Sequence, residues 1–419
     1  MFKYLQYIWN IYINKQMLTL LALGFSSGFP YFLVFGTLSV WLDDLSISLQ
    51  LIGAFSLVKL PYSLKWAWSP VLDNVKLPLL WRLGRRRSWA VLIQISLFLS
   101  LIAMSLTNPQ QHTMQMAMLA LLTSFLSASQ DIVLDAYRVE TFADFPDKQA
   151  SGVAIFVLGY RFGLIFAGAG AIYLASFLSW REVYIIMACG IFVGLLAILA
   201  AKEAQFYEYK KYTLKIKDSL LFFKNSIINP FIDFMTHQHW ILILVLIFTY
   251  HLSNAYFNPM IYPFYAAIGF TKVEIAYVIK LYGMIAAIAG GLAGGVIVAK
   301  IGLKRSLWWF GILQCISTLL FSLQAMAGHN MPLFIAVVTI ENFCSGLVTT
   351  ALVAYISSLC NKLYTATQYA LLSSVTSISR DVFCSTSGMV ADIVGWEWFF
   401  VVCALMSIPS LFIIRKFIK

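Results

Sequence analysis

The sequence predicts an all-α, polytopic membrane protein with about twelve transmembrane helices in two pseudo-symmetric six-helix halves. Three observations predict this fold. Of the 419 residues, 61% are hydrophobic and only 11% are charged, the mean hydropathy is +0.82, and long apolar runs recur along the chain. Soluble domains carry roughly a quarter of charged residues. Because the runs exceed the roughly 20 residues that a transmembrane helix needs, a soluble fold and a barrel of short strands are both excluded.

The apolar runs are separated by short polar loops, and we expect each run to form one transmembrane helix. The first six cover residues 17–42, 49–72, 88–106, 113–138, 149–175 and 180–201. The other six cover residues 238–263, 272–299, 305–327, 331–358, 364–391 and 396–414. We therefore expect an N-terminal half at 1–201, a basic cytoplasmic linker at 202–237 that lies on lipid headgroups, and a C-terminal half at 238–419.

The net charge of +11 is explained by membrane topology rather than by a nucleic-acid partner. If the N-terminus lies in the cytoplasm, nearly every Lys and Arg outside the spans falls on the cytoplasmic side, and only Arg181 and Lys272 fall on the other. Such an imbalance is the positive-inside rule. We expect a multi-pass membrane protein with both termini in the cytoplasm.

The two halves align with each other at a nearly constant offset. Residues 83–89 match residues 301–307 at an offset of 218, and the same offset places Ala136-Tyr137 on Ala354-Tyr355. Internal repeats of this kind are typical of transporters, in which the binding site lies at the repeat interface. Six spans, a basic loop and six more spans describe the major facilitator fold, and we expect a monomer.

Charged residues lie on one face of the fourth predicted span. Asp131, Asp135 and Arg138 fall within roughly 60° of one another on a helix and must point into protein or water, because a charge facing lipid is costly. The two aspartates are candidates for proton coupling. The alternative is a structural ion pair with Arg138. Gln130 beside them is a candidate to bind the cargo.

Two arginines occupy equivalent positions in the halves, because Arg161 and Arg380 are separated by 219 residues. Each lies near the middle of a predicted span, and a guanidinium group binds a carboxylate in two-point geometry. We expect both to bind an anionic part of the substrate. The structural alternative is pairing with a carboxylate within the protein, for which the candidates are Asp131, Asp135, Asp381 and Glu341.

Several further polar residues lie within predicted spans. Glu341 and His251 are secondary candidates for proton coupling, since an intramembrane acid and an imidazole both change charge near working pH. Lys59, Asn254 and Asn258 are candidates for substrate binding. A lone histidine is more often a structural hydrogen-bonding group, and that alternative stays open for His251.

A candidate gate lies between the second and third predicted spans. Asp73 ends one span, and Gly84-Arg85-Arg86-Arg87 begins the next. Charge-assisted hydrogen bonds between them can hold the cytoplasmic side closed and then release it. The alternative is a topology signal next to a solvated aspartate. Gly28, two residues before Pro30, is a candidate bending point for the first span.

Four segments of the N-terminal half resemble the AmpG-type anhydromuropeptide permeases: residues 24–30, 60–73, 83–89 and 128–138. The resemblance implies a proton symporter of the major facilitator superfamily that lies in the inner membrane. It also implies import of N-acetylglucosaminyl-anhydromuramyl peptides, fragments of the cell wall, from periplasm to cytoplasm for recycling. Because that family resembles acetyl-coenzyme A transporters, exchange of an acyl-coenzyme A or another organic anion is the alternative.

An integral membrane enzyme is disfavoured by the absence of a recognisable reaction centre. The sequence offers no Ser-His-Asp set, no phosphate-binding loop, and no metal-ligand spacing among its six cysteines. We therefore expect no metal and no cofactor, with the proton as coupling ion. The expected partners are an amphipathic glycopeptide or organic anion and the surrounding lipids.

Overall fold

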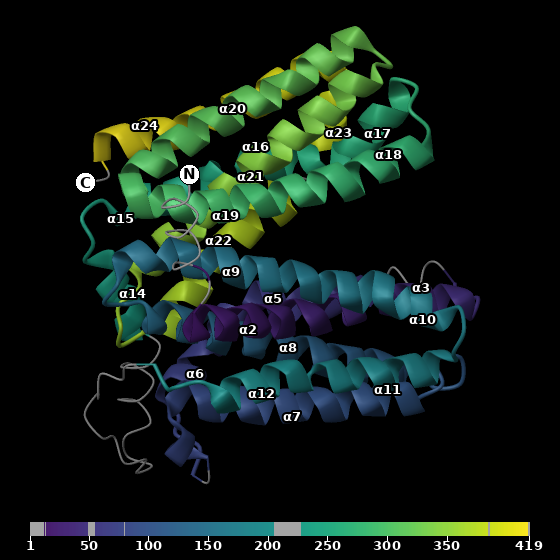
Figure 1. The fold of residues 1–419 in the computed structure, drawn as a ribbon, viewed down its shortest axis with the longest axis vertical. Helices are drawn as coiled ribbons and strands as arrows, with labels where there is room; N and C mark the ends of the chain where they lie inside the picture. Colours follow the sequence, from purple (N-terminus) through teal and green to yellow (C-terminus); the bar gives the residue numbers. More distant parts are fainter. Residues whose placement is uncertain are drawn as a thin grey trace. The chain divides into compact units, whose positions relative to one another are not determined.

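The computed structural model describes residues 12, 14–48, 55–78, 80–204, 228–383 and 386–417. Within these ranges the regular structure is helical and contains no strand (Figure 1). Most of the predicted linker, residues 205–227, lies outside the described residues, and so does the side chain of Arg380.

The N-terminal part contains long helices interrupted by short 3₁₀ or π segments, which are labelled η. The elements are α2 (Lys15–Phe32), η1 (Leu33–Thr37), α3 (Leu38–Asp44), η2 (Phe55–Lys59), α5 (Leu60–Leu64), η3 (Lys65–Ala67), α6 (Ser69–Asn74), η4 (Trp81–Leu83), α7 (Arg85–Leu106), α8 (Thr113–Thr141), α9 (Pro146–Ile165), η5 (Phe166–Gly170), α10 (Ala171–Ala175), α11 (Trp180–Gly190) and α12 (Phe192–Ala200).

The C-terminal part follows the same scheme. Its elements are α14 (Asn229–Met235), α15 (Trp240–Tyr250), α16 (Leu252–Phe257), η8 (Asn258–Met260), α17 (Ile261–Ala267), α18 (Lys272–Tyr277), η9 (Val278–Gly283), α19 (Met284–Ile301), α20 (Leu303–Ala327), α21 (Met331–Leu359), α22 (Thr365–Phe383), α23 (Ser387–Leu405) and α24 (Ile408–Phe417).

Ten helical stretches among the described residues are long and apolar enough to cross a membrane. They correspond to ten of the twelve predicted spans. The second predicted span, 49–72, begins in residues outside the description and is divided into η2, α5, η3 and α6, with Pro61 and Pro70 near the starts of α5 and α6. The eleventh, 364–391, contains the 19-residue helix α22, which is rich in Ser and Thr. Both segments are helical without meeting the length and composition of a simple span.

The internal repeat is visible in the helices themselves. Helices α8 and α21 each have 29 residues, and their first residues, Thr113 and Met331, are separated by the same offset of 218. Gly84 and Gly302, also separated by 218, precede α7 and α20 with φ angles of 101° and 82°. Glycine is favoured at both positions because other residues rarely adopt a positive φ.

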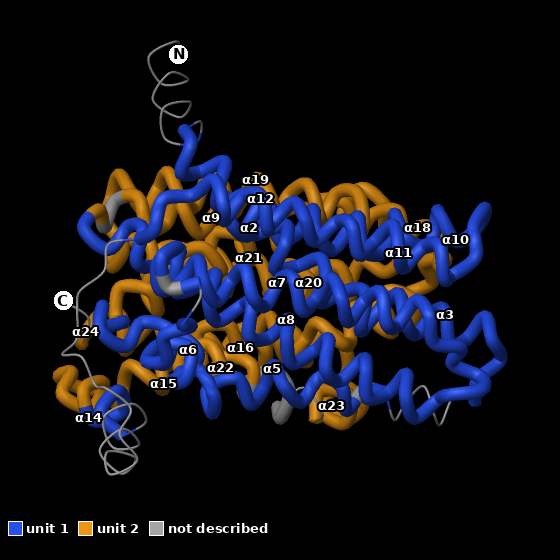
Figure 2. Tube along the Cα trace, turned by 90° about the horizontal axis from the view of Figure 1, so that it is seen from below, with its two compact units in different colours: residues 1–144, 155–232, 360–371 blue, residues 145–154, 233–359, 372–419 orange. Residues whose placement is uncertain are grey.

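The contacts divide the chain into two compact units, shown in different colours in Figure 2. Unit 1 contains residues 1–144, 155–232 and 360–371, and unit 2 contains residues 145–154, 233–359 and 372–419. The change between units near residue 232 falls within the predicted linker. Residues 145–154 occur in the N-terminal half of the sequence but belong to unit 2 by their contacts. Residues 360–371 occur in the C-terminal half but belong to unit 1.

Glycines allow α2 and α9 to approach closely within unit 1. A Cβ atom on Gly24 would lie 2.1 Å from the carbonyl oxygen of Phe156, and one on Gly159 would lie 2.0 Å from the carbonyl oxygen of Leu21. At Gly28 the added atom would meet the carbonyl oxygen of Tyr160 at 2.3 Å. Gly28 thus lies in a close helix contact, and the departure from α-helical geometry follows later, in the π segment η1.

Unit 2 has an aromatic core. The core includes Phe257, Phe264, Phe321, Phe334, Phe399 and Phe400, each at most 2% exposed. The rings pack edge-to-face or offset, as at Phe264 and Phe400, whose centroids are 4.8 Å apart. Because these rings bury one another, the aromatic core stabilises unit 2 and leaves almost no ring surface accessible to a ligand.

Candidate functional site

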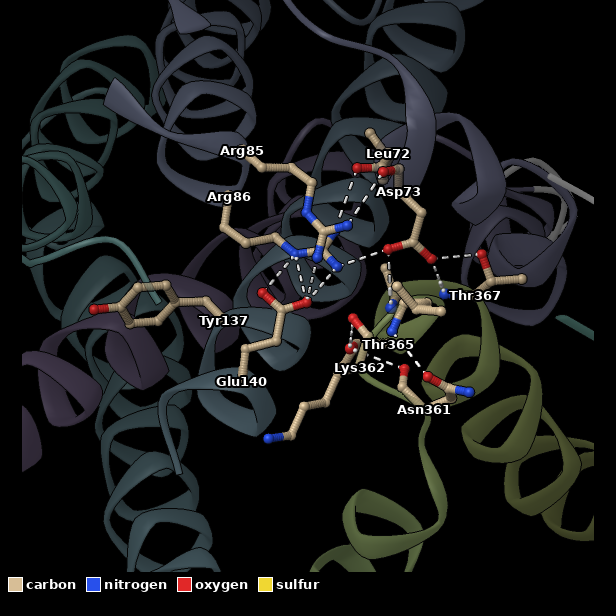
Figure 3. A network of polar contacts seen from close by, with 12 residues as sticks. Leu72, Asp73, Arg85, Arg86, Tyr137, Glu140, Asn361, Lys362, Thr365 and Thr367 are labelled. Atoms are coloured by element: carbon tan, nitrogen blue, oxygen red, sulfur yellow. Dashed lines mark hydrogen bonds and ion pairs between the residues drawn. The ribbon is translucent and has the colours of Figure 1, made fainter. Parts of the chain in front are cut away.

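A buried network of charges joins α6, α7 and α8 within unit 1 (Figure 3). Arg86 is fully buried. Its Nη2 atom lies 2.6 Å from Oδ1 of Asp73 and 2.6 Å from Oε1 of Glu140, and its Nε atom donates to Glu140 as well. Arg85 donates to Glu140 over 2.7 Å. We call Asp73, Arg85, Arg86 and Glu140 the arginine network.

The start of α7 is capped by a carboxylate from another part of the chain. The first N–H groups of a helix have no partner within the helix. Glu203, which follows α12, accepts hydrogen bonds from the backbone N–H groups of Arg86 at 2.7 Å and Arg87 at 3.2 Å. Burial raises the pKa of Glu203, although these two N–H groups lower it. Arg87 in turn donates to the carbonyl oxygens of Ile198 and Leu199 at the end of α12.

Asp73 also binds the first turn of α22, in the segment that belongs to unit 1. Its Oδ2 atom accepts from the backbone N–H and the hydroxyl of Thr367 at 2.8 and 2.7 Å, and Oδ1 accepts from the N–H of Ala366 at 3.3 Å. A negative charge at a helix N-terminus is stabilising. Asp73 thus serves as the N-terminal cap of a helix that lies 294 residues further along the chain.

The charge state of Asp73 follows from these partners. Asp73 lies outside the ten membrane-spanning stretches. Burial raises the pKa of its carboxyl group, but the Arg86 and Arg85 guanidinium groups and the Thr367 hydrogen bond outweigh burial and hold the pKa below its usual range. The carboxylate is therefore ionised at neutral pH and can hold α22 through charge-assisted hydrogen bonds. The solvated aspartate considered as the alternative is not what the structure shows, because Asp73 is 5% exposed.

The predicted charged face of α8 separates into two pairs. Asp135 forms an ion pair with Arg138 over 3.2 Å. This is the structural role that we considered from the sequence as the alternative to proton coupling. Arg138 is fully buried and its guanidinium carbon lies 5.3 Å from the ring centre of Tyr369. Asp131 instead accepts a hydrogen bond of 2.5 Å from the hydroxyl of Ser27 on α2, and Lys65 is the cation that acts on it electrostatically.

The two lysines of the second predicted span have different surroundings. Lys65 is buried, at 9% exposed. Lys59 is exposed, and its Nζ atom lies 5.6 Å from the ring centre of Phe35. The short 3₁₀ segments η2 and η3 change the direction of successive side chains, so ideal α-helical spacing does not predict which lysine is buried.

An aromatic cluster lies beside Asp131 in unit 1. We define it as Tyr31, Phe35, Tyr62 and Tyr160, all of them half-buried. The ring of Tyr31 has its centre 4.7 Å from Phe35, 5.1 Å from Tyr62 and 6.4 Å from Tyr160. The hydroxyl of Tyr62 donates to Oγ of Ser127 over 2.6 Å, and Asp131 acts electrostatically on Tyr62.

The remaining substrate-binding candidates of this unit lie in different environments. Gln130 is fully buried, and its Nε2 atom donates to the carbonyl oxygen of Ser26 over 2.6 Å. Gln130 and Asp131 thus both contact α2, at Ser26 and Ser27, and the binding of cargo by Gln130 stays a prediction. Arg161 is half-buried, and among the described residues no carboxylate lies within ion-pair distance of it.

Unit 2 contains a second acidic site. Glu341 on α21 is 5% exposed and accepts a hydrogen bond of 2.6 Å from Nδ2 of Asn254 on α16. The break between α15 and α16 falls at His251, whose Nε2 atom lies 3.3 Å from the hydroxyl of Thr349. Asn258 is exposed at the start of η8. The structure thus brings Glu341 and Asn254 together, while His251 contacts α21 at Thr349, which is about two helical turns beyond Glu341.

Several residues of these sites were not predicted. Glu140 and Glu203 anchor the arginines, Thr367 binds Asp73, and Ser27 binds Asp131. The sequence contains one usable signal, since Glu140 is a fourth charge on the end of an apolar run. Among the described residues, no group of three or more His, Cys, Asp and Glu side chains is placed to hold a metal ion.

Known proteins are similar to this chain in sequence. The Major Facilitator Superfamily profile matches residues 20–379 and 243–419. "Putative transporter AmpG 4" of Rickettsia felis is 37% identical over 97% of this chain and 97% of its own length. The "Anhydromuropeptide permease" of Escherichia coli K12 is 34% identical over 98% of this chain and 81% of its own length.

Solved structures resemble the fold at low sequence identity. The human organic anion transporter MFSD10 gives a TM-score of 0.67 at 12% identity, over 97% of this chain and 99% of its own. The proton:xylose symporter XylE gives a TM-score of 0.66 at 11% identity, over 97% and 96%. The helical fold and its intramembrane charges define a secondary transporter. The chain belongs to the Major Facilitator Superfamily and, within it, to the AmpG-type permeases.

Proposed function

We propose that this transporter imports anhydromuropeptides from the periplasm to the cytoplasm together with protons, by alternating access, and that it is not an enzyme. The proposal places the chain in the inner membrane with both termini in the cytoplasm, as the distribution of Lys and Arg favours. The cargo class is supported by the permease of Escherichia coli, which is similar over nearly the whole chain.

The proposal of proton coupling is based on the position of Asp131. It lies within the membrane-spanning stretch Thr113–Thr141, is half-buried, and is held by a hydroxyl group and faced by Lys65. Ionisable residues inside a membrane are costly and mark proton or substrate pathways. Asp135 is already occupied by its ion pair with Arg138, so Asp131 is the better carrier of the two. Glu341 is the candidate of unit 2.

The arginine network is the proposed cytoplasmic gate. Asp73 connects Arg86 to the first turn of α22, so the helix end is released when these hydrogen bonds break. Buried polar contacts of this kind are either made or lost, and such elements switch between two states rather than deform gradually. A ligand shifts this equilibrium only by binding the two states differently.

Uptake by the reconstituted protein tests the proposal. Proteoliposomes with an acidic exterior should accumulate N-acetylglucosaminyl-anhydromuramyl tetrapeptide, and a protonophore should abolish the accumulation. Asp131→Asn should lose accumulation and keep exchange of labelled for unlabelled cargo, because a permanently neutral group cannot release a proton. Asp43→Asn, an exposed aspartate of α3, is the matched control. Absence of muropeptide uptake by the wild-type protein would overturn the cargo, and accumulation without a proton gradient would overturn the coupling.

A further inference from the structure

We propose that the aromatic cluster of unit 1 is the saccharide subsite of this transporter, where the sugar part of the cargo stacks on tyrosine rings beside Asp131. The inference rests on the proposed function and deepens it, because it assigns one part of the glycopeptide to one group of residues. Sequence reasoning could not select these rings from 33 Phe, 21 Tyr and 12 Trp.

The cluster is assembled from three parts of the sequence, at residues 31–35, 62 and 160. Tyr31 comes from α2, Phe35 from η1, Tyr62 from α5 and Tyr160 from α9. The centres of Phe35 and Tyr62 lie 5.6 Å apart, and those of Tyr31 and Tyr62 lie 5.1 Å apart in an edge-to-face arrangement. The close approach of α2 and α9 at Gly28 and Gly159 brings the helix of Tyr160 against that of Tyr31.

These rings are half-buried, which separates them from the aromatic core of unit 2. Phe264, Phe399 and Phe400 in that core are 0% exposed. A ring that retains exposed surface beside polar groups has both an apolar face and a hydrogen-bonding edge available to a ligand. Sugar rings present apolar C–H faces and polar rims, so they match this combination of surfaces.

Polar groups of α5 and α8 lie at the cluster. The hydroxyl of Tyr62 already donates to Ser127, so its oxygen can accept a hydrogen bond from a sugar hydroxyl or amide. Asp131 keeps an oxygen beyond the one bonded to Ser27. A few convergent polar groups on a mostly aromatic surface are typical of small-molecule sites.

The charges decide which end of the cargo fits here. Asp131 lies near Tyr62 and disfavours an anion, so an uncharged sugar suits this side of the cluster. Lys59 lies over the ring of Phe35, and Arg161 follows Tyr160 in sequence without a carboxylate partner among the described residues. The anionic peptide stem is thereby directed toward Lys59 and Arg161, and the saccharide toward the rings.

Binding of two separate probes by the purified full-length protein tests the assignment. The probes are diacetylchitobiose, an uncharged N-acetylated disaccharide, and the free stem tetrapeptide, each measured by displacement of the labelled muropeptide. Tyr62→Leu and Tyr160→Leu should weaken displacement by the disaccharide about tenfold, on the scale of one lost aromatic contact, and leave displacement by the peptide unchanged. Tyr62→Phe keeps the ring and should weaken it less than Tyr62→Leu.

Tyr173→Leu is the matched control, since Tyr173 is an exposed aromatic residue of the same unit whose ring contacts Phe177. It should leave both probes unaffected. Each variant is compared by gel filtration and thermal unfolding, and Tyr31→Leu replaces any variant that does not stay monodisperse. If the wild-type protein binds the muropeptide and the leucine variants bind the disaccharide normally, the subsite is wrong and the proposed function stands. If the wild-type protein binds no muropeptide, both fail.

Discussion

Replacing Asp73 by asparagine should loosen the first turn of α22. The carboxylate accepts four hydrogen bonds, from Arg86 at 2.6 Å, from Ala366 at 3.3 Å, and from the N–H and hydroxyl of Thr367 at 2.8 and 2.7 Å. An amide offers one acceptor oxygen, and its NH₂ group must face donors on the other side. At least one buried donor is left without an acceptor, and Arg86 keeps Glu140 as its anion.

The size of the effect follows from the bonds lost. A hydrogen bond to a charged group contributes about 1.5–3 kcal/mol, and the remaining ones weaken with loss of the charge, so we expect a total of about 2–4 kcal/mol. At 1.4 kcal/mol for each factor of ten, the opening equilibrium should rise about 30- to 700-fold. Hydrogen exchange at the amides of Ala366 and Thr367 measures this directly, because their protection falls by the same factor.

Asp144→Asn supplies the matched control. Asp144 forms an ion pair with Lys362 in the same segment, but both side chains are more than a third exposed. Exposed ion pairs contribute about 0–1 kcal/mol, so this change should alter protection at Ala366 and Thr367 less than about fivefold. Equal protection in the two variants would refute the reasoning, because burial and charge at Asp73 would then have no measurable role.

Three further results are expected. Protection of Thr367 should not change between pH 8 and 5. The pKa of the Asp73 carboxyl group is lowered in the folded state. Its contribution to stability is therefore complete above its ordinary pKa, about 4, and is lost only as pH falls through the lower folded value. A loss of protection near pH 6 would show that another group titrates. Gly159→Leu should lower the thermal unfolding temperature more than Gly170→Leu. An added Cβ lies 2.0 Å from the carbonyl oxygen of Leu21 at Gly159 and meets open space at Gly170. Equal unfolding temperatures of the two variants would contradict the close contact of α2 and α9. Arg161→Gln should weaken binding of the labelled muropeptide by about 2–5 kcal/mol without affecting diacetylchitobiose; equal weakening of both probes would show that Arg161 acts through folding.

Sequence patterns predicted the parts of this fold that depend on local periodicity. The predicted spans 113–138 and 331–358 begin at the first residues of α8 and α21, although each helix is longer than predicted, at 29 residues. The aligned segments 83–89 and 301–307 contain Gly84 and Gly302, and the structure shows that both adopt a positive φ, which favours glycine. The helical grouping of Asp131, Asp135 and Arg138 follows from the same periodicity.

Contacts between distant residues could not be predicted in this way. Glu203 binds Arg86 across 117 residues, and Thr367 binds Asp73 across 294. No spacing rule connects such pairs, because they depend on how whole helices pack. The difference in exposure between Lys59 and Lys65 could not be predicted for another reason, since a proline and short 3₁₀ turns replace a uniform helix there.

The internal repeat also shows where the halves differ in chemistry. The offset of 218 places Gly291 at the position of Asp73 and Ser358 at that of Glu140. Arg305, which corresponds to Arg87, is exposed. The basic turn of the C-terminal half, residues 301–307, therefore lacks counterparts of Asp73 and Glu140. The turn is repeated in the second half, but the charged contacts of the arginine network are not.

The assignment of residues 360–371 to unit 1 has a consequence for biosynthesis. A ribosome completes Asp73, Arg86 and Glu140 long before it reaches Thr367, so the nascent first unit enters the membrane without the helix end that Asp73 caps. Until that segment arrives, water must hydrate the free side of the carboxylate. Maturation of the earliest part of the chain thus waits for nearly the last, and a stalled or truncated product would leave its first unit unfinished.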